Sequence, residues 1–247
     1  MAQTHEAEDW RSYRMDWKHP HKELESAGKE AEAVAAALET LVSAAILLHA
    51  RYDHEKMLAM RRAVRENFEI PWTAVTPRMQ RLLYAINAVH QPRTMAAVGI
   101  FCGNTFMANA GAACGPGACY KAARLVGIEI KEEEAERARH NVSRIDADGA
   151  AEIIAADGIE WLKDFDGVID LLYLDADGPK GKGKSIYLDL LEAGGHALHS
   201  GSIVLAHNSV NSAADLKDYL AFVRNPGNFR ESVNVIIDDQ GVEVSRK

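Results

Sequence analysis

A glycine-rich turn is the first feature of this sequence that could do chemistry. Gly99 and Gly103 flank a short stretch that follows an apolar run, and a helix is expected to start near Thr105. Glycine lets the backbone turn sharply and lie close to a ligand. Tight turns between strands and helices also need glycine for steric reasons alone, so this turn requires support from other residues.

An acidic residue gives that support, because Glu129 ends the next apolar run along the chain. At the carboxyl end of a neighbouring strand, a carboxylate can accept both hydroxyl protons of a ribose. The alternative is a charge that favours the start of the helix expected over residues 131–139. The order of strand, glycine turn and acid favours the ribose interpretation.

The third apolar run ends at Asp157 and Gly158. Asp157 would lie where the adenine edge of a nucleotide arrives. It is equally suited to cap the helix expected over residues 158–163. The two roles are compatible, and both stay open.

Two further runs end in polar residues that could bind a ligand. Asp175 ends the fourth run, and His207 and Asn208 end the fifth. Adjacent parallel strands bring these ends to the rim where open α/β sheets bind ligands. Imidazole titrates near neutrality and could serve as a general base. The alternative for His207 is a hydrogen-bonded rim residue without chemistry.

The elements that must position these residues are those of a parallel sheet. Short apolar runs alternate with helical patterns at residues 95–101, 125–130, 152–156, 168–174 and 202–206. Such alternation is typical of repeated β-α units. Residues 232–237 and 242–244 then form a hairpin around a turn ending in Gly241. We therefore predict an α/β fold with a Rossmann-like, doubly wound, mostly parallel seven-stranded sheet and an antiparallel C-terminal edge strand.

The region before this domain is predicted to be helical. Residues 29–67 show one amphipathic helical pattern, whose apolar face could pack on the chain's own domain or form a dimer seam. Residues 1–28 are polar and aromatic, and Trp10, Tyr13 and Trp17 could form a lid or dock the tail. We divide the chain into a helical N-terminal region, residues 1–72, for a lid or dimerisation, and a main domain, residues 73–247.

Composition narrows the range of partners. The net charge of −8 disfavours a phosphate backbone as partner. The three cysteines lack paired spacing and are expected to be free thiols in a reducing cytoplasm. No apolar stretch is long enough to span a bilayer. A cytoplasmic protein that binds neither nucleic acid nor membranes is expected.

Together these motifs resemble the catechol and caffeoyl-coenzyme A O-methyltransferases, the cation-dependent branch of class I S-adenosylmethionine-dependent enzymes. The resemblance covers residues 76–247 and rests on residues 95–108, 127–130, 172–177 and 201–208. It implies direct methyl displacement onto a small hydroxylated, catechol-like or phenol-like substrate, and a homodimer. The cofactor-binding residues that it implies, with those predicted above, are Gly99, Phe101, Gly103, Asn104, Thr105, Glu129, Ile130, Asp157, Gly158, Asp175 and Asp177.

The resemblance also implies a divalent cation, held by Asp175, His207 and Asn208. His207 stands where the family has an aspartate, Ala97 where it has an acidic residue, and Gly178 where it has a catalytic lysine. Magnesium prefers oxygen ligands, whereas imidazole suits zinc or manganese. Two interpretations stay open. The site could bind a different metal, or it could have lost its metal, in which case His207 would serve as the general base.

The loop after Asp177 carries three lysines, Lys180, Lys182 and Lys184. One of them could serve as base or bind an acidic group of the substrate, and Lys180 is taken as the candidate base; the alternative is a solvated basic loop. Two other functions stay in view. The chain could bind the cofactor as a regulatory subunit without transfer. A nicotinamide-dependent oxidoreductase is disfavoured, because the G-x-G-x-x-G motif is absent.

Overall fold

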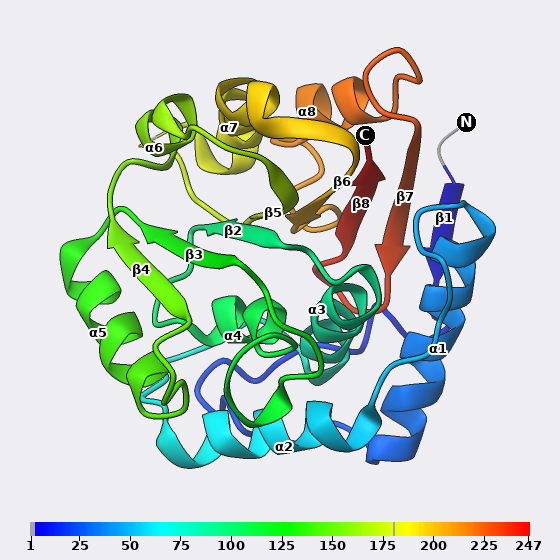
Figure 1. Cartoon of the computed structure of the whole chain (residues 1–247). Helices are drawn as coiled ribbons and strands as arrows, with labels where there is room; N and C mark the ends of the chain where they lie inside the picture. Colours follow the sequence, from blue (N-terminus) through cyan, green and yellow to red (C-terminus); the bar gives the residue numbers. More distant parts are fainter. Residues whose placement is uncertain (1–2, 180) are drawn as a thin grey trace.

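The alternating apolar runs form one sheet in the computed structural model, which describes residues 3–179 and 181–247. The strands are β1 (Gln3–Glu6), β2 (Thr94–Val98), β3 (Arg124–Glu129), β4 (Ala151–Ala155), β5 (Ile169–Leu174), β6 (Leu198–His207), β7 (Glu231–Ile236) and β8 (Val242–Arg246). Their order is β1-β7-β8-β6-β5-β2-β3-β4. The prediction of a Rossmann-like, mostly parallel sheet is confirmed (Figure 1).

The sheet differs from the expected one at its C-terminal hairpin. β8 runs antiparallel to both β6 and β7 and therefore lies inside the sheet. β7 would be the edge, but β1 pairs with it in parallel, from Gln3 opposite Val233 to Glu6 opposite Ile236. An eighth strand thus extends the seven predicted ones. The residues of β1 are polar and lack the alternation of apolar and polar residues from which a strand is predicted.

Helices cover both faces of the sheet (Figure 1). On one face lie α3 (Pro77–His90), α4 (Asn104–Ala110) and α5 (Glu132–Ser143), and on the other α6 (Gly158–Asp164), α7 (Ile186–Gly194) and α8 (Lys217–Val223). Short 3-10 helices are η1 (Gly115–Gly117), η2 (Gly183–Ser185) and η3 (Gly195–Ala197). Among the described residues, no helix combines the length and apolarity needed to cross a membrane.

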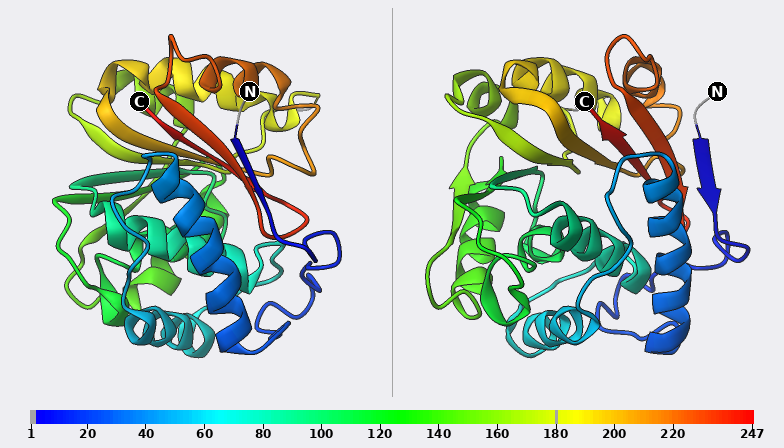
Figure 2. Two further views of the ribbon diagram at one scale, coloured as in Figure 1. Left: turned by 90° about the vertical axis from the view of Figure 1, so that its right-hand side faces the viewer. Right: turned by 45° about the vertical axis from the view of Figure 1, so that its right-hand side comes forward.

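The prediction of one helix over residues 29–67 is wrong. The chain forms α1 (Ala27–Ser43) and α2 (His54–Asn67), which lie outside α3 and α4 (Figures 1 and 2). Ala45 adopts a left-handed conformation with φ of 57°, which stops α1. Asp53 then caps α2 by accepting a hydrogen bond from the backbone of Lys56. The apolar face of α1 is buried within the chain, chiefly against α3, which supports packing on the chain's own domain.

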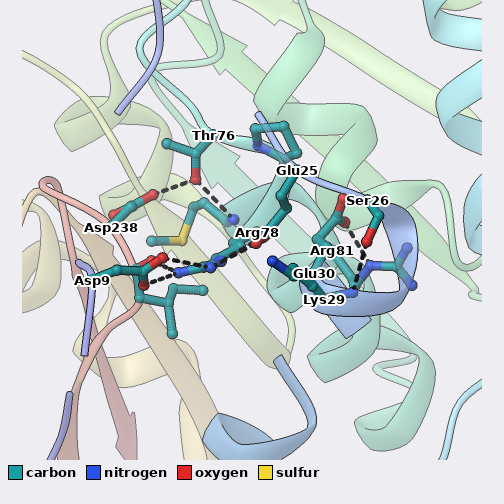
Figure 3. A network of polar contacts seen from close by, with 12 residues as sticks. Asp9, Glu25, Ser26, Lys29, Glu30, Thr76, Arg78, Arg81 and Asp238 are labelled. Carbon is teal, nitrogen blue, oxygen red and sulfur yellow. Dashed lines mark hydrogen bonds and ion pairs between the residues drawn. The ribbon is translucent and has the colours of Figure 1, made fainter. Parts of the chain in front are cut away.

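Polar contacts fix the N-terminal segment to the start of α3 (Figure 3). The guanidinium of Arg78 lies 2.6 Å from a carboxylate oxygen of Asp9 and 2.7 Å from one of Glu25. Two residues before Arg78, the hydroxyl group of Thr76 donates a hydrogen bond of 2.5 Å to the carboxylate of Asp238. Asp238 lies in the turn between β7 and β8. Asp238 is fully buried, and burial raises the pKa of its carboxyl group. The segment before α1 is therefore docked on the main domain.

Candidate active site

All but two of the predicted site residues meet in one cavity of about 890 Å³ at the carboxyl ends of the parallel strands β2 to β6. Its lining includes Gly99, Phe101, Asn104, Thr105, Glu129, Ile130, Asp157, Gly158, Asp175, Asp177, His207 and Asn208. Gly103 does not line the cavity, because it caps α4 behind the turn. Lys180 lies outside the described residues. This edge of the sheet is where open α/β folds bind ligands.

The glycine turn between β2 and α4 is held in an unusual backbone conformation. Gly99 has a φ of 82°, and a Cβ atom placed on it would lie 2.4 Å from the backbone nitrogen of Ala176. Only glycine permits so close an approach of the turn to the segment after β5. Phe101 also has a positive φ, of 49°. The turn therefore leaves its backbone open to the cavity while it packs against the end of β5.

Glu129 ties the glycine turn to the end of β3. One carboxylate oxygen accepts the backbone N–H of Phe101 at 2.8 Å, and the other accepts that of Lys131 at 3.1 Å. The side chain is buried, yet it lines the cavity. Each oxygen of a carboxylate can accept a further hydrogen bond. The predicted ribose contact is thus compatible with a bracing role that the sequence did not reveal.

Asp157 is both a helix cap and part of the cavity wall. Its carboxylate accepts the backbone N–H of Ile159 at 2.8 Å, which confirms the capping interpretation. Gly158 is buried against Val98, and a Cβ atom there would lie 2.4 Å from a methyl group of that valine. Ile130 is 65% exposed beside them. The predicted adenine contact at this end stays a prediction.

At the other end of the cavity, Asp175 carries three polar contacts. Its Oδ1 atom lies 3.0 Å from Nζ of Lys184 and 3.3 Å from Nδ1 of His207, and its Oδ2 accepts the hydroxyl of Tyr173 at 3.1 Å. Burial alone would raise the pKa of Asp175, but Lys184 and His207 lower it to about 2. The carboxylate is therefore charged and oriented from both oxygens.

His207 is the least satisfied side chain at this rim. It is only 2% exposed, and its alignment with Asp175 falls short of a hydrogen bond. Within the described residues, neither ring nitrogen has a hydrogen-bond partner. Buried polar atoms are rarely left without a partner, so this imidazole keeps unused hydrogen-bonding capacity beside the cavity.

The predicted metal ligands do not form a divalent cation site as they stand. The described residues contain no cluster of three or more His, Cys, Asp or Glu side chains suited to a metal. Asp175 supplies the sole carboxylate of the predicted set, and its Oδ1 already contacts an ammonium group. The Asn208 amide donates to Asn211 and to Gln240, at 3.1 and 2.7 Å. The donor set has one hard anionic ligand, already neutralised by Lys184.

Among the described lysines of the loop, the structure singles out Lys184. Lys182 pairs at the surface with Asp189, 2.5 Å away, as a solvated residue would. Lys184 begins the turn into α7 with its side chain only 12% exposed, which contradicts the solvated-loop interpretation at this position. Burial alone would lower its pKa, but Asp175 and Asp177 raise it, so the group is an ammonium. In the sequence, Lys180, Lys182 and Lys184 alternate with glycines, and this pattern did not indicate which of the three would lie at the site.

The sequence also gave no sign that Trp72 borders the cavity. Its ring lies 4.9 Å from that of Phe101 and 6.5 Å from that of Trp17. The Trp17 carbonyl accepts the backbone N–H of Thr73 at 3.2 Å. The N-terminal segment is therefore docked beside the cavity mouth, where it supports an aromatic wall.

Comparison with known proteins agrees with this geometry. Residues 96–209, which carry the glycine turn and the rim residues, match a family described as a methyltransferase domain. No curated protein sequence matches the chain.

Solved structures with the same fold span almost the whole chain. A Podospora anserina methyltransferase bound to S-adenosylhomocysteine is 14% identical, with a TM-score of 0.62 over 92% of this chain and 99% of its own. The Streptomyces achromogenes O-methyltransferase of tomaymycin synthesis, with S-adenosylmethionine, is 19% identical, with a TM-score of 0.58 over 88% and 98%. A Bacillus cereus O-methyltransferase with S-adenosylhomocysteine is 14% identical, with a TM-score of 0.56 over 88% and 100%. The predicted fold of class I methyltransferases is confirmed.

Proposed function

We propose that this chain, which carries a methyltransferase domain, transfers a methyl group from S-adenosylmethionine to a hydroxyl oxygen of a small catechol-like or phenol-like acceptor. The observation that carries the proposal is that one cavity joins the glycine turn and Glu129 to the pair of Asp175 and His207. The first group suits a nucleoside cofactor. The second suits removal of a proton from an acceptor.

The cofactor lies along the strand ends in this proposal. Glu129 would accept the ribose hydroxyls, and Ile130 and Asp157 would border the adenine. Gly99 would border the methionine part, and Asp175 would lie near the sulfonium. Phe101, Asn104, Thr105, Gly158 and Asp177 line the same path.

The acceptor occupies the remaining space beside His207. Apolar side chains of Trp72, Val75 and Ile186 also line the cavity, and they suit a small aromatic ring. The acceptor O–H bond breaks as the proton passes to the imidazole of His207. The oxygen then forms a bond to the methyl carbon while the bond from carbon to sulfur breaks, which leaves S-adenosylhomocysteine. Asp175 steadies the imidazolium that forms.

We also propose a homodimer, in line with the family that the sequence resembles. The apolar face of α1 is covered within the chain. A dimer would therefore use another surface, and the region before residue 73 keeps its proposed role beside the cavity. Light scattering at several protein concentrations tests the oligomeric state.

Calorimetric titration with S-adenosylhomocysteine is the direct test of the cofactor site. We expect saturable binding at one site per chain. Turnover is then followed as S-adenosylhomocysteine released in the presence of a panel of catechols and phenols. Binding without turnover on any acceptor would favour a regulatory subunit, and no binding at all would contradict the proposed function.

A further inference from the structure

The contact between Lys184 and Asp175 occupies the place where the family that the sequence resembles holds a divalent cation. We propose that the ammonium group of Lys184 replaces that cation, so that methyl transfer by this chain needs no metal. The inference rests on the proposed function for its chemistry, but the cation site can be tested without turnover.

The first argument is the position of the charge. Nζ of Lys184 lies 3.0 Å from both Oδ1 and the carbonyl oxygen of Asp175, and 3.5 Å from Oδ1 of Asp177. A cation bound to Asp175 at ordinary ligand distances, about 2.0–2.6 Å, would overlap with this group or be strongly repelled by it. Lys184 therefore opposes a metal at Oδ1 of Asp175.

The second argument is the local backbone, which holds Lys184 in place. The Gly178 N–H donates to the Gly183 carbonyl at 2.9 Å and closes the loop. Gly183 has a positive φ of 48°, and η2 leads directly into α7. Lys184 therefore projects from the base of a helix, whereas Gly178 leaves the usual position of the family's lysine without a side chain. Glycine in place of lysine at position 178 and the ammonium group of Lys184 are therefore two parts of the same change at this rim.

The third argument is the change at the neighbouring ligand. His207 replaces a carboxylate and so removes one negative charge from the rim. With Asp175 as the one carboxylate of the predicted ligand set, a singly charged ammonium balances that carboxylate, whereas a divalent ion would leave excess positive charge beside it. A fixed cation here can stabilise an acceptor oxygen as it loses its proton.

Manganese binding, measured by electron paramagnetic resonance, provides the test. We expect no stoichiometric Mn²⁺ binding to the wild-type chain, and no loss of activity with EDTA. Lys184→Met should lower turnover by roughly 100-fold, in the range of losses seen when a preorganised charge is removed. It should also bind Mn²⁺ more tightly than wild type, because Asp175 is freed. Lys163→Met, an exposed lysine on α6 paired with Glu160, is the matched control and should resemble wild type.

Lys184→Arg separates an effect of charge from an effect on folding, because it keeps a positive charge at this position. The variant should not gain Mn²⁺ binding, and its melting temperature should match that of the wild type. Stoichiometric Mn²⁺ binding to wild type that Asp175→Asn abolishes would overturn the proposal, as would loss of activity with EDTA. Titration with S-adenosylhomocysteine keeps the two proposals distinguishable. If the wild type fails to bind it, the proposed function fails, while the Mn²⁺ result still decides which cation occupies the rim.

Discussion

Nδ1 of His207 lies 3.3 Å from Oδ1 of Asp175, across the ends of the adjacent parallel strands β5 and β6. The imidazole borders the cavity, and within the described residues its ring nitrogens have no hydrogen-bond partner. The contact resembles the pairing by which a carboxylate holds a catalytic histidine in one orientation. The pair is the basis of the first prediction.

His207→Gln should lower turnover by about 10²–10⁴-fold, the usual contribution of a general base. Binding of S-adenosylhomocysteine should change little, because His207 contacts the acceptor rather than the nucleoside in the proposed arrangement. His199→Gln, at the opposite end of β6 and outside the cavity, is the control. Equal activity of the two variants would rule out His207 as base.

Glu129→Gln should weaken binding of S-adenosylhomocysteine by roughly 10- to 100-fold, because hydrogen bonds to a charged group contribute about 1.5–3 kcal/mol. The variant also loosens the glycine turn, which Glu129 braces through Phe101. Calorimetry gives the two affinities. Glu133→Gln, an exposed residue on the next helix, should leave the affinity unchanged. A similar loss in both variants would mean that general surface charge, rather than Glu129, governs binding.

The ionisation of Asp175 should make stability depend on pH at the acidic end. Its pKa falls from 3.8 to about 2 in the folded chain, so its stabilising effect is fully present above pH 3.8 and is lost as the pH falls through about 2. The shift corresponds to about 2 kcal/mol. Urea unfolding of wild type and Asp175→Asn should show this difference at pH 6, and the gap should narrow toward pH 2. A gap that is constant over this range would contradict the depressed pKa.

Arg78 should be the main anchor of the N-terminal segment. Its side chain is 5% exposed and contacts Asp9 and Glu25, so Arg78→Met should destabilise the fold by about 3 kcal/mol through the unpaired Glu25. Limited proteolysis should then cut before α1 more readily. Arg65→Met breaks the exposed pair with Glu23 and should cost less than about 1 kcal/mol. Comparable denaturation midpoints for the two variants would show that the segment does not depend on Arg78.

The sheet and the cavity could be predicted because their signals are local. Apolar runs that end in glycine or acid residues mark the strand ends, and parallel strands bring those ends to one rim. The turn at Gly99, the acid at Glu129 and the rim pair of Asp175 and His207 were found in this way. The break between α1 and α2 was not predicted, because it depends on the left-handed backbone conformation of Ala45. Alanine is not a residue type that indicates this conformation.

The residues that escaped prediction act over long sequence distances. Thr76 contacts Asp238, and Trp72 contacts Phe101, through packing that no periodicity reveals. Lys184 could not be separated from its neighbours, because the path of a loop with several glycines is set by tertiary contacts. Side chains on the regular elements were therefore predictable, whereas the loop and the N-terminal segment needed the structure.

The parallel pairing of β1 with β7 has a consequence for self-association. A sheet that ended at β7 would offer a six-residue strand as a template for another chain. The strand that covers it has four residues, mostly exposed and polar, and so offers a poor template in turn. The first strand of the chain thus protects the protein against edge-to-edge aggregation, at a distance from the site where the chemistry is proposed.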